Sequence, residues 1–145
     1  MADHEARVRA ARAADRDLVW PLARELATSF RPERAAFDAL FGTLLSDPDT
    51  LVLVAETAEG EITGYLLAFR HPAFHANGAV AWVEEVMVSD RSRRTGAGRR
   101  LMASAEQWAR TGGAAYLALA TRRAASFYRA LGYEDSAVYF RKTLA

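Results

Sequence analysis

Two glycines near the middle of the chain follow a strongly apolar stretch and open a segment with helical periodicity. They are Gly96 and Gly98, which lie between Ser89 and Arg100. Glycine lets a backbone turn tightly and approach a ligand closely. The first turn of a helix adds free N–H groups and a positive dipole end. This arrangement predicts an anion site, for which a phosphate or pyrophosphate is the natural occupant.

Five arginines surround these glycines at positions 91, 93, 94, 99 and 100, and salt would screen their charge. The spacing excludes a P-loop, because arginines follow the second glycine where lysine and a hydroxyl residue are required. It also departs from the dinucleotide fingerprint, because Leu101 stands where a third glycine or alanine is needed. A plain turn from strand to helix with solvated arginines is the alternative interpretation.

Two adjacent acidic residues, Glu84 and Glu85, interrupt the apolar stretch before the glycines. Burial of two neighbouring charges would be costly without a function. Side chains alternate along a strand, so one glutamate should face a cleft and the other a helix or a second subunit, unless a bulge intervenes. The alternative is one solvated carboxylate and one in a salt bridge.

Apolar periodicity predicts the elements that must position these residues. The expected class is α/β (α+β), with a mixed sheet of six to seven strands, helices on both faces and the order βααβββαβαβ(β). The strand–helix–strand unit in the middle should be right-handed with parallel strands, which points to a ligand site between Val86 and Gly98. The predicted strands span 8–11, 50–57, 61–70, 79–88 and 115–120, with one or two more within 133–141 and a loop at 71–78. The predicted helices begin near 15, at Pro32, at 98 and at 122, and the first of them reaches Phe30.

Length and composition limit the classes of function. The 145 residues favour one domain over 1–145, and 51% hydrophobic with 26% charged residues is ordinary globular usage. The absence of cysteine excludes disulfides, thiolate metal sites and cysteine nucleophiles. A net charge of +1 predicts no nucleic-acid partner and no membrane partner, and no acidic or histidine cluster has metal-ligand spacing. The missing metal-ligand spacing predicts a protein without a metal. Neither a long apolar run nor a signal sequence is evident, so a cytoplasmic protein is expected.

Two segments together resemble the motifs of a known family. Val83–Met102 is similar to the central motif of the GNAT acyl-CoA N-acyltransferases, and Ala124–Tyr133 to their second motif, Ala-x-x-Phe-Tyr-x-x-x-Gly-Phe. The two segments follow in the family's order, and the order of elements agrees across nearly the whole chain. Glu84 and Glu85 before the apolar triplet are closest to the polyamine acetyltransferases of that family.

The resemblance implies acetyl-CoA as co-substrate and a GNAT-like domain. Main-chain N–H groups of the glycine loop would hold the pyrophosphate, and loop arginines would reach its oxygens. Pantetheine would lie between the splayed strands 79–88 and 115–120, where an N–H near Met87 or Val88 would polarise the thioester carbonyl. Thr121 stands where the family often has asparagine, and its hydroxyl would have to replace that contact. The cofactor-binding residues implied are Val86, Met87, Val88, Arg93, Arg94, Thr95, Gly96, Ala97, Gly98, Arg99 and Thr121.

The same resemblance assigns catalytic roles to three residues. Amide formation needs a neutral amine, so a base must take the proton of an alkylammonium whose pKa is ~10.4. The alignment favours Glu84 as this base, directly or through a water, and leaves Glu85 to bind the amine. Tyr128 would give a proton to the leaving thiolate; the alternative is an aromatic residue packed beside Phe127.

These inferences lead to three hypotheses. The first is an N-acetyltransferase that moves acetyl from acetyl-CoA to a primary amine of a small molecule or peptide, by direct attack in a ternary complex. The second is an acyl-CoA sensor without catalysis. The third, a nucleic-acid module using Arg91 to Arg100, is disfavoured by the near-zero net charge. A homodimer is expected from the resemblance alone.

Overall fold

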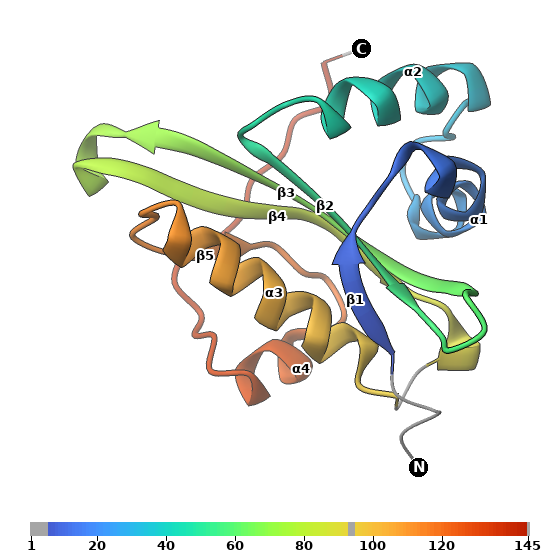
Figure 1. Ribbon diagram of the computed structural model, residues 1–145. Helices are drawn as coiled ribbons and strands as arrows, with labels where there is room; N and C mark the ends of the chain where they lie inside the picture. The colour runs from blue at the N-terminus through green and yellow to red at the C-terminus, as the bar shows by residue number, and fades with distance from the viewer. Residues whose placement is uncertain (1–5, 93–94, 145) are drawn as a thin grey trace.

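Five strands form one mixed sheet in the computed structural model, which describes residues 6–92 and 95–144. Their spatial order follows their order in the sequence (Figure 1). Neighbouring strands among the first four are antiparallel, whereas the last two are parallel. The strands are β1 (Arg7–Ala10), β2 (Thr50–Glu56), β3 (Ile62–Ala73), β4 (Gly78–Val88) and β5 (Leu117–Leu119).

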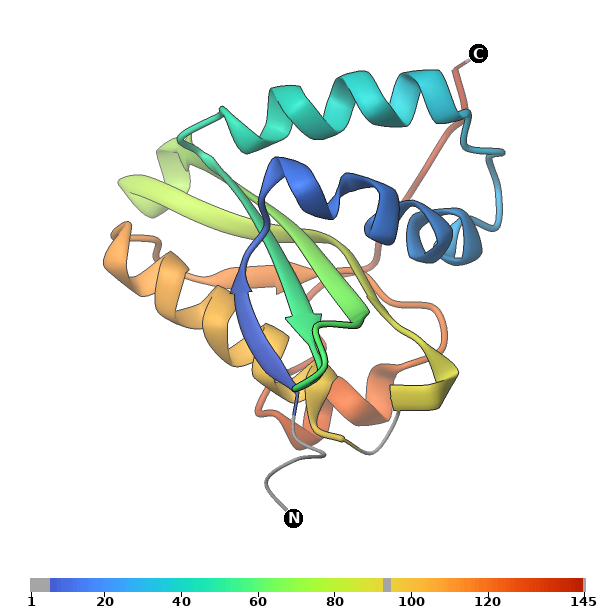
Figure 2. The same cartoon turned by 45° about the vertical axis from the view of Figure 1, so that its right-hand side comes forward.

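Helices cover both faces of this sheet, as the sequence predicted. Figure 2 shows α1 (Arg16–Leu26) and α2 (Arg34–Leu45) on one face, and α3 (Ala97–Thr111) and α4 (Ala125–Ala130) on the other. Short 3-10 turns precede α1 (Ala13–Asp15), join β3 to β4 (Phe74–Ala76) and follow β4 (Asp90–Ser92). The two helical layers therefore place the end of β4 between them.

The alternation of side chains along the strands builds a separate core on each face. In β2, Leu53 and Ala55 belong to the core beneath α3, whereas Val54 belongs to the core beneath α1 and α2. Leu101 and Met102 of α3 are completely buried in the first core. The strand–helix–strand unit that contains the glycine loop is thus anchored by buried side chains of α3.

The boundaries of the first two helices differ from the prediction. The first helix was expected to reach Phe30, but it ends at Leu26, and Ala27 is extended (φ −67°, ψ 130°). The second was expected to open at Pro32, but it begins at Arg34 after an extended Glu33 (φ −109°, ψ 136°). Residues 28–30 form bends between the two helices, and Pro32 disfavours helical backbone in the residue directly before it.

The predicted loop at 71–78 is mostly strand. His71, Pro72 and Ala73 pair with Val80, Ala79 and Gly78, so the β3–β4 hairpin turns only at residues 74–77. The ladder between β2 and β3 starts at Phe69, and beyond it β3 has a free edge. A proline is tolerated there because the strand lacks a partner that needs its N–H.

The expected strands within 133–141 are absent, because residues 133–144 form neither helix nor strand. The sheet therefore has five strands over the described residues instead of six to seven. The strand β5 was predicted over 115–120, but it pairs through only three residues. So short a strand offers a sixth strand too few backbone groups to pair with. The segment instead stays extended along the molecule, where Tyr139 stacks on Trp82 at 6.4 Å and Arg141 donates to Ser29.

A buried ion pair fixes the start of α1 to the sheet. Asp15 is only 3% exposed, and both of its carboxylate oxygens accept from the Arg9 guanidinium at 2.8 and 2.9 Å. Its Oδ2 also accepts from the Arg12 amide at 2.7 Å, and Arg9 reaches Glu56 of β2. Hydrogen bonds from Arg9 lower the pKa of Asp15 and the pKa of Glu56.

We expect Asp15→Asn to lower the free energy of unfolding by about 2 to 4 kcal/mol, because it leaves Arg9 without its main partner. The ionised pair stabilises the fold above the ordinary pKa of 3.8, and this stabilisation disappears as the pH falls through the lower folded-state value. Urea unfolding followed by circular dichroism at pH 7 and pH 3 measures both effects. Asp17→Asn, at an exposed carboxylate, is the control, and an equally small change in both variants would contradict the prediction.

Candidate active site

The glycine loop lies where the structure passes from β4 to α3. Gly96 caps α3 with left-handed backbone (φ 80°), which glycine adopts without strain, and its carbonyl accepts from the Arg100 amide at 2.9 Å. Thr95 is tied down on the other side, since its amide and hydroxyl both donate to the Ser92 carbonyl. The first-turn amides of α3 have no acceptor within the helix, so this end of α3 can bind an anion.

Gly98 occupies the point where α3, α4 and the end of β4 meet. A Cβ at this position would lie 3.3 Å from Cζ of Phe127 and 3.9 Å from Cγ2 of Val88. Glycine therefore lets the second motif pack directly against the first. Ala97, beside it, is 1% exposed.

The arginines near the glycine loop, of which Arg93, Arg94 and Arg99 were predicted to reach the phosphates, are placed differently. Arg99 is exposed on the first turn of α3, beside the glycine loop. Arg91 is paired with Glu61, which leaves it less available to a ligand. Arg93 and Arg94 lie outside the described residues.

β4 and β5 diverge just before the glycine loop, as predicted from the sequence. Their parallel pairing ends at Val83 with Leu119. From Glu84 to Val88, β4 pairs only with β3 over the described residues. The edge of β4 that faces away from β3 is therefore open for a ligand to pair with its backbone. Side chains of Val86 and Val88 pack toward the α3 core and Met87 toward the opposite core.

A β-bulge at Glu84 changes the expected placement of the two glutamates. Leu67 pairs with Glu85 and Ala68 pairs with Val83, so Glu84 is the extra residue of β4. Regular alternation would have sent the carboxylates to opposite faces. With the bulge, both line one cavity of about 700 Å³.

That cavity lies between the α1–α2 pair and the region where β4, β5 and α4 meet. It brings together Glu84, Glu85, Val86, Thr121 and Tyr128, which the sequence analysis had placed in one site. The described residues of the glycine loop from Thr95 to Arg99 are not part of its lining and lie beyond it at the start of α3.

Tyr65 of β3 holds Glu85 in place. Its hydroxyl donates to Oε1 of Glu85 at 2.7 Å, and the tyrosine is only 3% exposed. Burial raises the pKa of Tyr65, and the neighbouring carboxylate raises it further, so the phenol stays a neutral donor. The sequence analysis missed Tyr65, because its distance from Glu85 depends on the register between β3 and β4. Glu84, by contrast, is exposed and has no hydrogen-bond partner among the described residues.

Tyr128 both packs and lines the cavity. Its ring meets Phe127 at 5.0 Å and Tyr133 at 6.0 Å, each edge to face. Burial raises the pKa of Tyr128, so its phenol is protonated at neutral pH. The two interpretations made from the sequence, a packed aromatic and a proton donor, are therefore compatible in one side chain.

Thr121 lies at the mouth of the same cavity, just before α4. Its Oγ1 accepts from the Ala124 amide at 3.1 Å. Because a hydroxyl can donate while it accepts, the hydrogen of this group remains available for a ligand.

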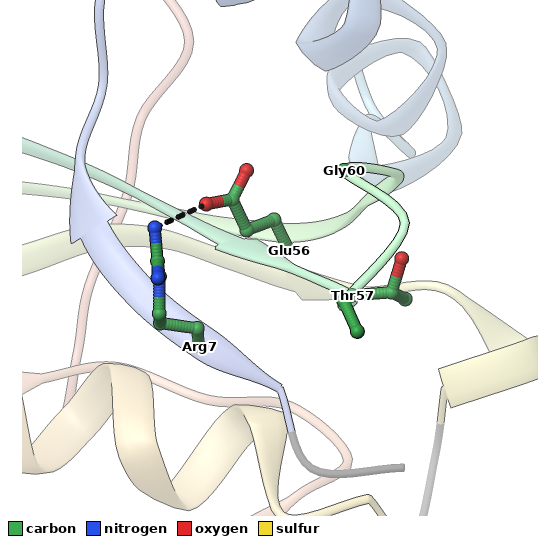
Figure 3. A pocket seen from close by; sticks show the side chains of 5 residues that line it. Arg7, Glu56, Thr57 and Gly60 are labelled. Carbon is green, nitrogen blue, oxygen red and sulfur yellow. Dashed lines mark ion pairs between the residues drawn. The ribbon is translucent and has the colours of Figure 1, made fainter. Parts of the chain in front are cut away.

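A second hollow of about 280 Å³ lies at the β2–β3 turn and shares no described lining residue with the cavity of Glu84 and Glu85. It is lined by Arg7, Glu56, Thr57, Ala58 and Gly60 (Figure 3). Arg7 and Glu56 are already joined at 3.4 Å, so this hollow offers no comparable chemistry. Within residues 6–92 and 95–144 there is no group of three potential metal ligands, and none of the helices there has the length and apolar character of a membrane span.

Comparisons with known proteins agree with this architecture. No curated protein matches the chain by sequence. Glucosamine-6-phosphate N-acetyltransferase from Arabidopsis thaliana has a similar structure, with a TM-score of 0.85 and 19% identity over 97% of this chain and 99% of that chain. An acetyltransferase of Trypanosoma brucei superposes with a TM-score of 0.82 and 21% identity, over 97% of this chain and 100% of that chain. An aminoglycoside acetyltransferase from an uncultured soil metagenomic sample gives 0.80 and 18%, with both chains fully covered.

These structural similarities establish the fold, and the family follows from the sequence match. Residues 16–133 match the acetyltransferase (GNAT) family, which covers most of the chain and both of its motifs. The resemblance noted from the sequence is thereby confirmed at the level of the family, while the polyamine type within it stays a prediction. The chain belongs to the GNAT family of acetyltransferases.

Proposed function

We propose that this enzyme transfers the acetyl group of acetyl-CoA to a primary amine of a small molecule or peptide, by direct attack while both substrates are bound. The observation that carries the proposal is the departure of β4 from β5 at the bulged Glu84. It leaves a free strand edge and two carboxylates in one cavity.

The described residues fit acetyl-CoA, which would supply an acetyl group activated as a thioester. The amides at the start of α3, with Gly96 and Gly98, suit the pyrophosphate, and Arg99 adds a positive charge there. The free edge of β4 at Val86–Val88 suits the amides of pantetheine. Thr121 has a hydroxyl hydrogen to donate at the opposite side of the opening.

The two carboxylates suit different tasks because their surroundings differ. Glu85 is held by Tyr65 and can bind the ammonium group of the acceptor in a fixed place. Glu84 is exposed within the cavity and free to take the proton that must leave before the amine can attack. Tyr128 holds a phenolic proton at the cavity wall for the departing thiolate.

The proposal is tested by calorimetry with CoA and by acetyl-CoA-dependent release of thiol with a panel of amines. We expect CoA to bind and at least one amine to be acetylated. Binding of CoA without acetylation of any amine would favour the sensor hypothesis instead. Failure to bind CoA would overturn both interpretations.

We also propose that the protein is a homodimer. Support comes from the C-terminal segment, residues 134–144, which has no strand partner in the described chain but exposes large apolar side chains. Val138 is 77% exposed, Phe140 87% and Leu144 91%. Burial of these side chains and of an unpaired extended backbone against a second copy would remove both from water.

Light scattering after size-exclusion chromatography should therefore give twice the mass of the chain. Phe140→Glu should shift the protein toward the monomer, because a charge in an apolar interface is costly. Phe74→Glu, at an equally exposed position on the β3–β4 turn, is the control. A monomeric wild-type protein, or the same behaviour of both variants, would contradict the proposed interface.

A further inference from the structure

The part of the cavity formed by α1, α2 and their connection is mostly apolar although it is open to solvent; Thr28, Ser29 and Glu33 are its polar residues. Phe30 is 64% exposed and Leu40 is 57% exposed, yet both line the cavity. Large apolar side chains that remain exposed around a hollow are typical of a binding surface. The apolar wall consists of Leu26, Phe30, Phe37, Leu40, Phe41 and Leu44.

Among the described residues, the charged ones that line the cavity are Glu33 in the α1–α2 connection, the two glutamates of β4 and two arginines. Glu84 and Glu85 lie on the strand side, where an ammonium group would be held. Arg122 and Arg141 line the cavity as well, and Nη2 of Arg141 donates to Ser29 at 3.2 Å. Ser29 precedes Phe30 in the chain, so this guanidinium lies beside the apolar wall.

A polyamine is poorly matched to this distribution of charge. Once its first ammonium is bound at the β4 carboxylates, a further ammonium finds only one more carboxylate in the described lining, Glu33, and elsewhere would lose water against apolar side chains or approach an arginine. A sugar amine is poorly matched for a related reason, because the six side chains of the wall offer no hydrogen-bonding group to its hydroxyls, and in this part of the described lining only Thr28, Ser29 and Glu33 do. An apolar body would instead bury its surface and that of the wall together.

We infer that the acceptor is a free monoamine whose amino group is carried on an apolar body, such as an aralkylamine or a longer alkylamine. This inference rests on the proposed function and specifies its acceptor. It departs from the polyamine type that the adjacent glutamates suggested, because the two carboxylates of β4 account for one ammonium group and the rest of the described lining offers a single further carboxylate, Glu33, against two arginines.

The test measures kcat/KM of the full chain with ethylamine, butylamine, hexylamine, phenethylamine, spermidine and glucosamine. We expect kcat/KM to rise about fourfold for each added methylene, as burial of apolar surface predicts. Phenethylamine should exceed spermidine and glucosamine by about tenfold or more. A preference for spermidine or glucosamine would overturn the inference, and so would a faster reaction of the tripeptide Phe-Gly-Gly than of phenethylamine.

Variants of the wall give a second, independent readout. Phe30→Ser and Leu40→Ser change exposed side chains, so folding should be preserved, and circular dichroism checks this. Each should lower kcat/KM for phenethylamine by about tenfold, with a much smaller loss for ethylamine and no change in CoA binding. Phe74→Ser is the matched control on the distant turn. Equal losses for all amines would overturn the role of the wall.

The outcomes separate this inference from the proposed function. If spermidine is acetylated efficiently and phenethylamine is not, the acetyltransferase proposal stands and the apolar acceptor is wrong. If CoA binds but no amine releases thiol, both are wrong. A graded preference for longer apolar amines that Phe30→Ser removes supports both.

Discussion

Replacement of Glu84 by glutamine is expected to lower kcat/KM for the amine by about 10²- to 10³-fold near neutral pH, the range that a positioned general base contributes. Glutamine keeps the size of the side chain but cannot take a proton. Since Glu84 is exposed and the bulge residue of β4, the substitution should leave the sheet intact. Thiol release at saturating acetyl-CoA, measured against amine concentration, gives the effect.

The dependence of this loss on pH distinguishes a base from a binding residue. An alkylamine loses its own proton as the pH approaches ~10, so the variant should recover relative to the wild-type enzyme as the pH rises. Glu85→Gln should instead raise KM for the amine, because Glu85 is held by Tyr65 and cannot move toward a proton as freely. Glu59→Gln, at an exposed turn outside the cavity, is the control. If the loss in Glu84→Gln were independent of pH, Glu84 would not be the base. If only Glu85→Gln recovered activity at high pH, Glu85 would be the base and Glu84 would bind the amine.

The sequence predicted correctly those helices and strands whose positions follow from a local pattern of apolar residues. The apolar run at 79–88 became β4 (Gly78–Val88), and the periodic segment after the glycines became α3 (Ala97–Thr111). Both are long elements with one strongly apolar side. The end of β3 and the C-terminal segment were predicted wrongly, because the length of a strand depends on the partner available beside it. His71–Ala73 have that partner in β4, whereas residues 133–144 have none in the described chain.

For the candidate site, too, the sequence predicted the residues but not their arrangement. The types and order of its residues pointed to Glu84, Glu85 and Tyr128, and the cavity brings all three together. The arrangement within the cavity depends on one irregular step in the β3–β4 ladder, between Leu67 and Ala68. That step belongs to the pairing of the two strands, so the sequence around Glu84 alone does not determine it. Tyr65 was not predicted for the same reason, because its hydrogen bond to Glu85 depends on how β3 pairs with β4.

Tyr128→Phe is the second substitution with a large expected effect, and it separates chemistry from packing within one side chain. Removal of the hydroxyl keeps the ring, and therefore the contacts with Phe127 and Tyr133. If the phenol protonates the leaving thiolate, kcat should fall about 10²-fold. The dissociation constant of CoA should change by less than about twofold, because no contact with the nucleotide side is lost.

The measurements are turnover by thiol release, CoA affinity by calorimetry and the thermal midpoint by circular dichroism. Tyr116→Phe, whose hydroxyl meets His75 far from the cavity, is the matched control. Because burial raises the pKa of Tyr128 above its ordinary value of about 10, the wild-type enzyme should keep its proton donor across the neutral and mildly alkaline range. Loss of activity as the pH rises past that range should therefore occur in the wild type and be missing in Tyr128→Phe. Unchanged turnover in the variant would leave the ring as a packing residue and assign protonation of the thiolate to solvent.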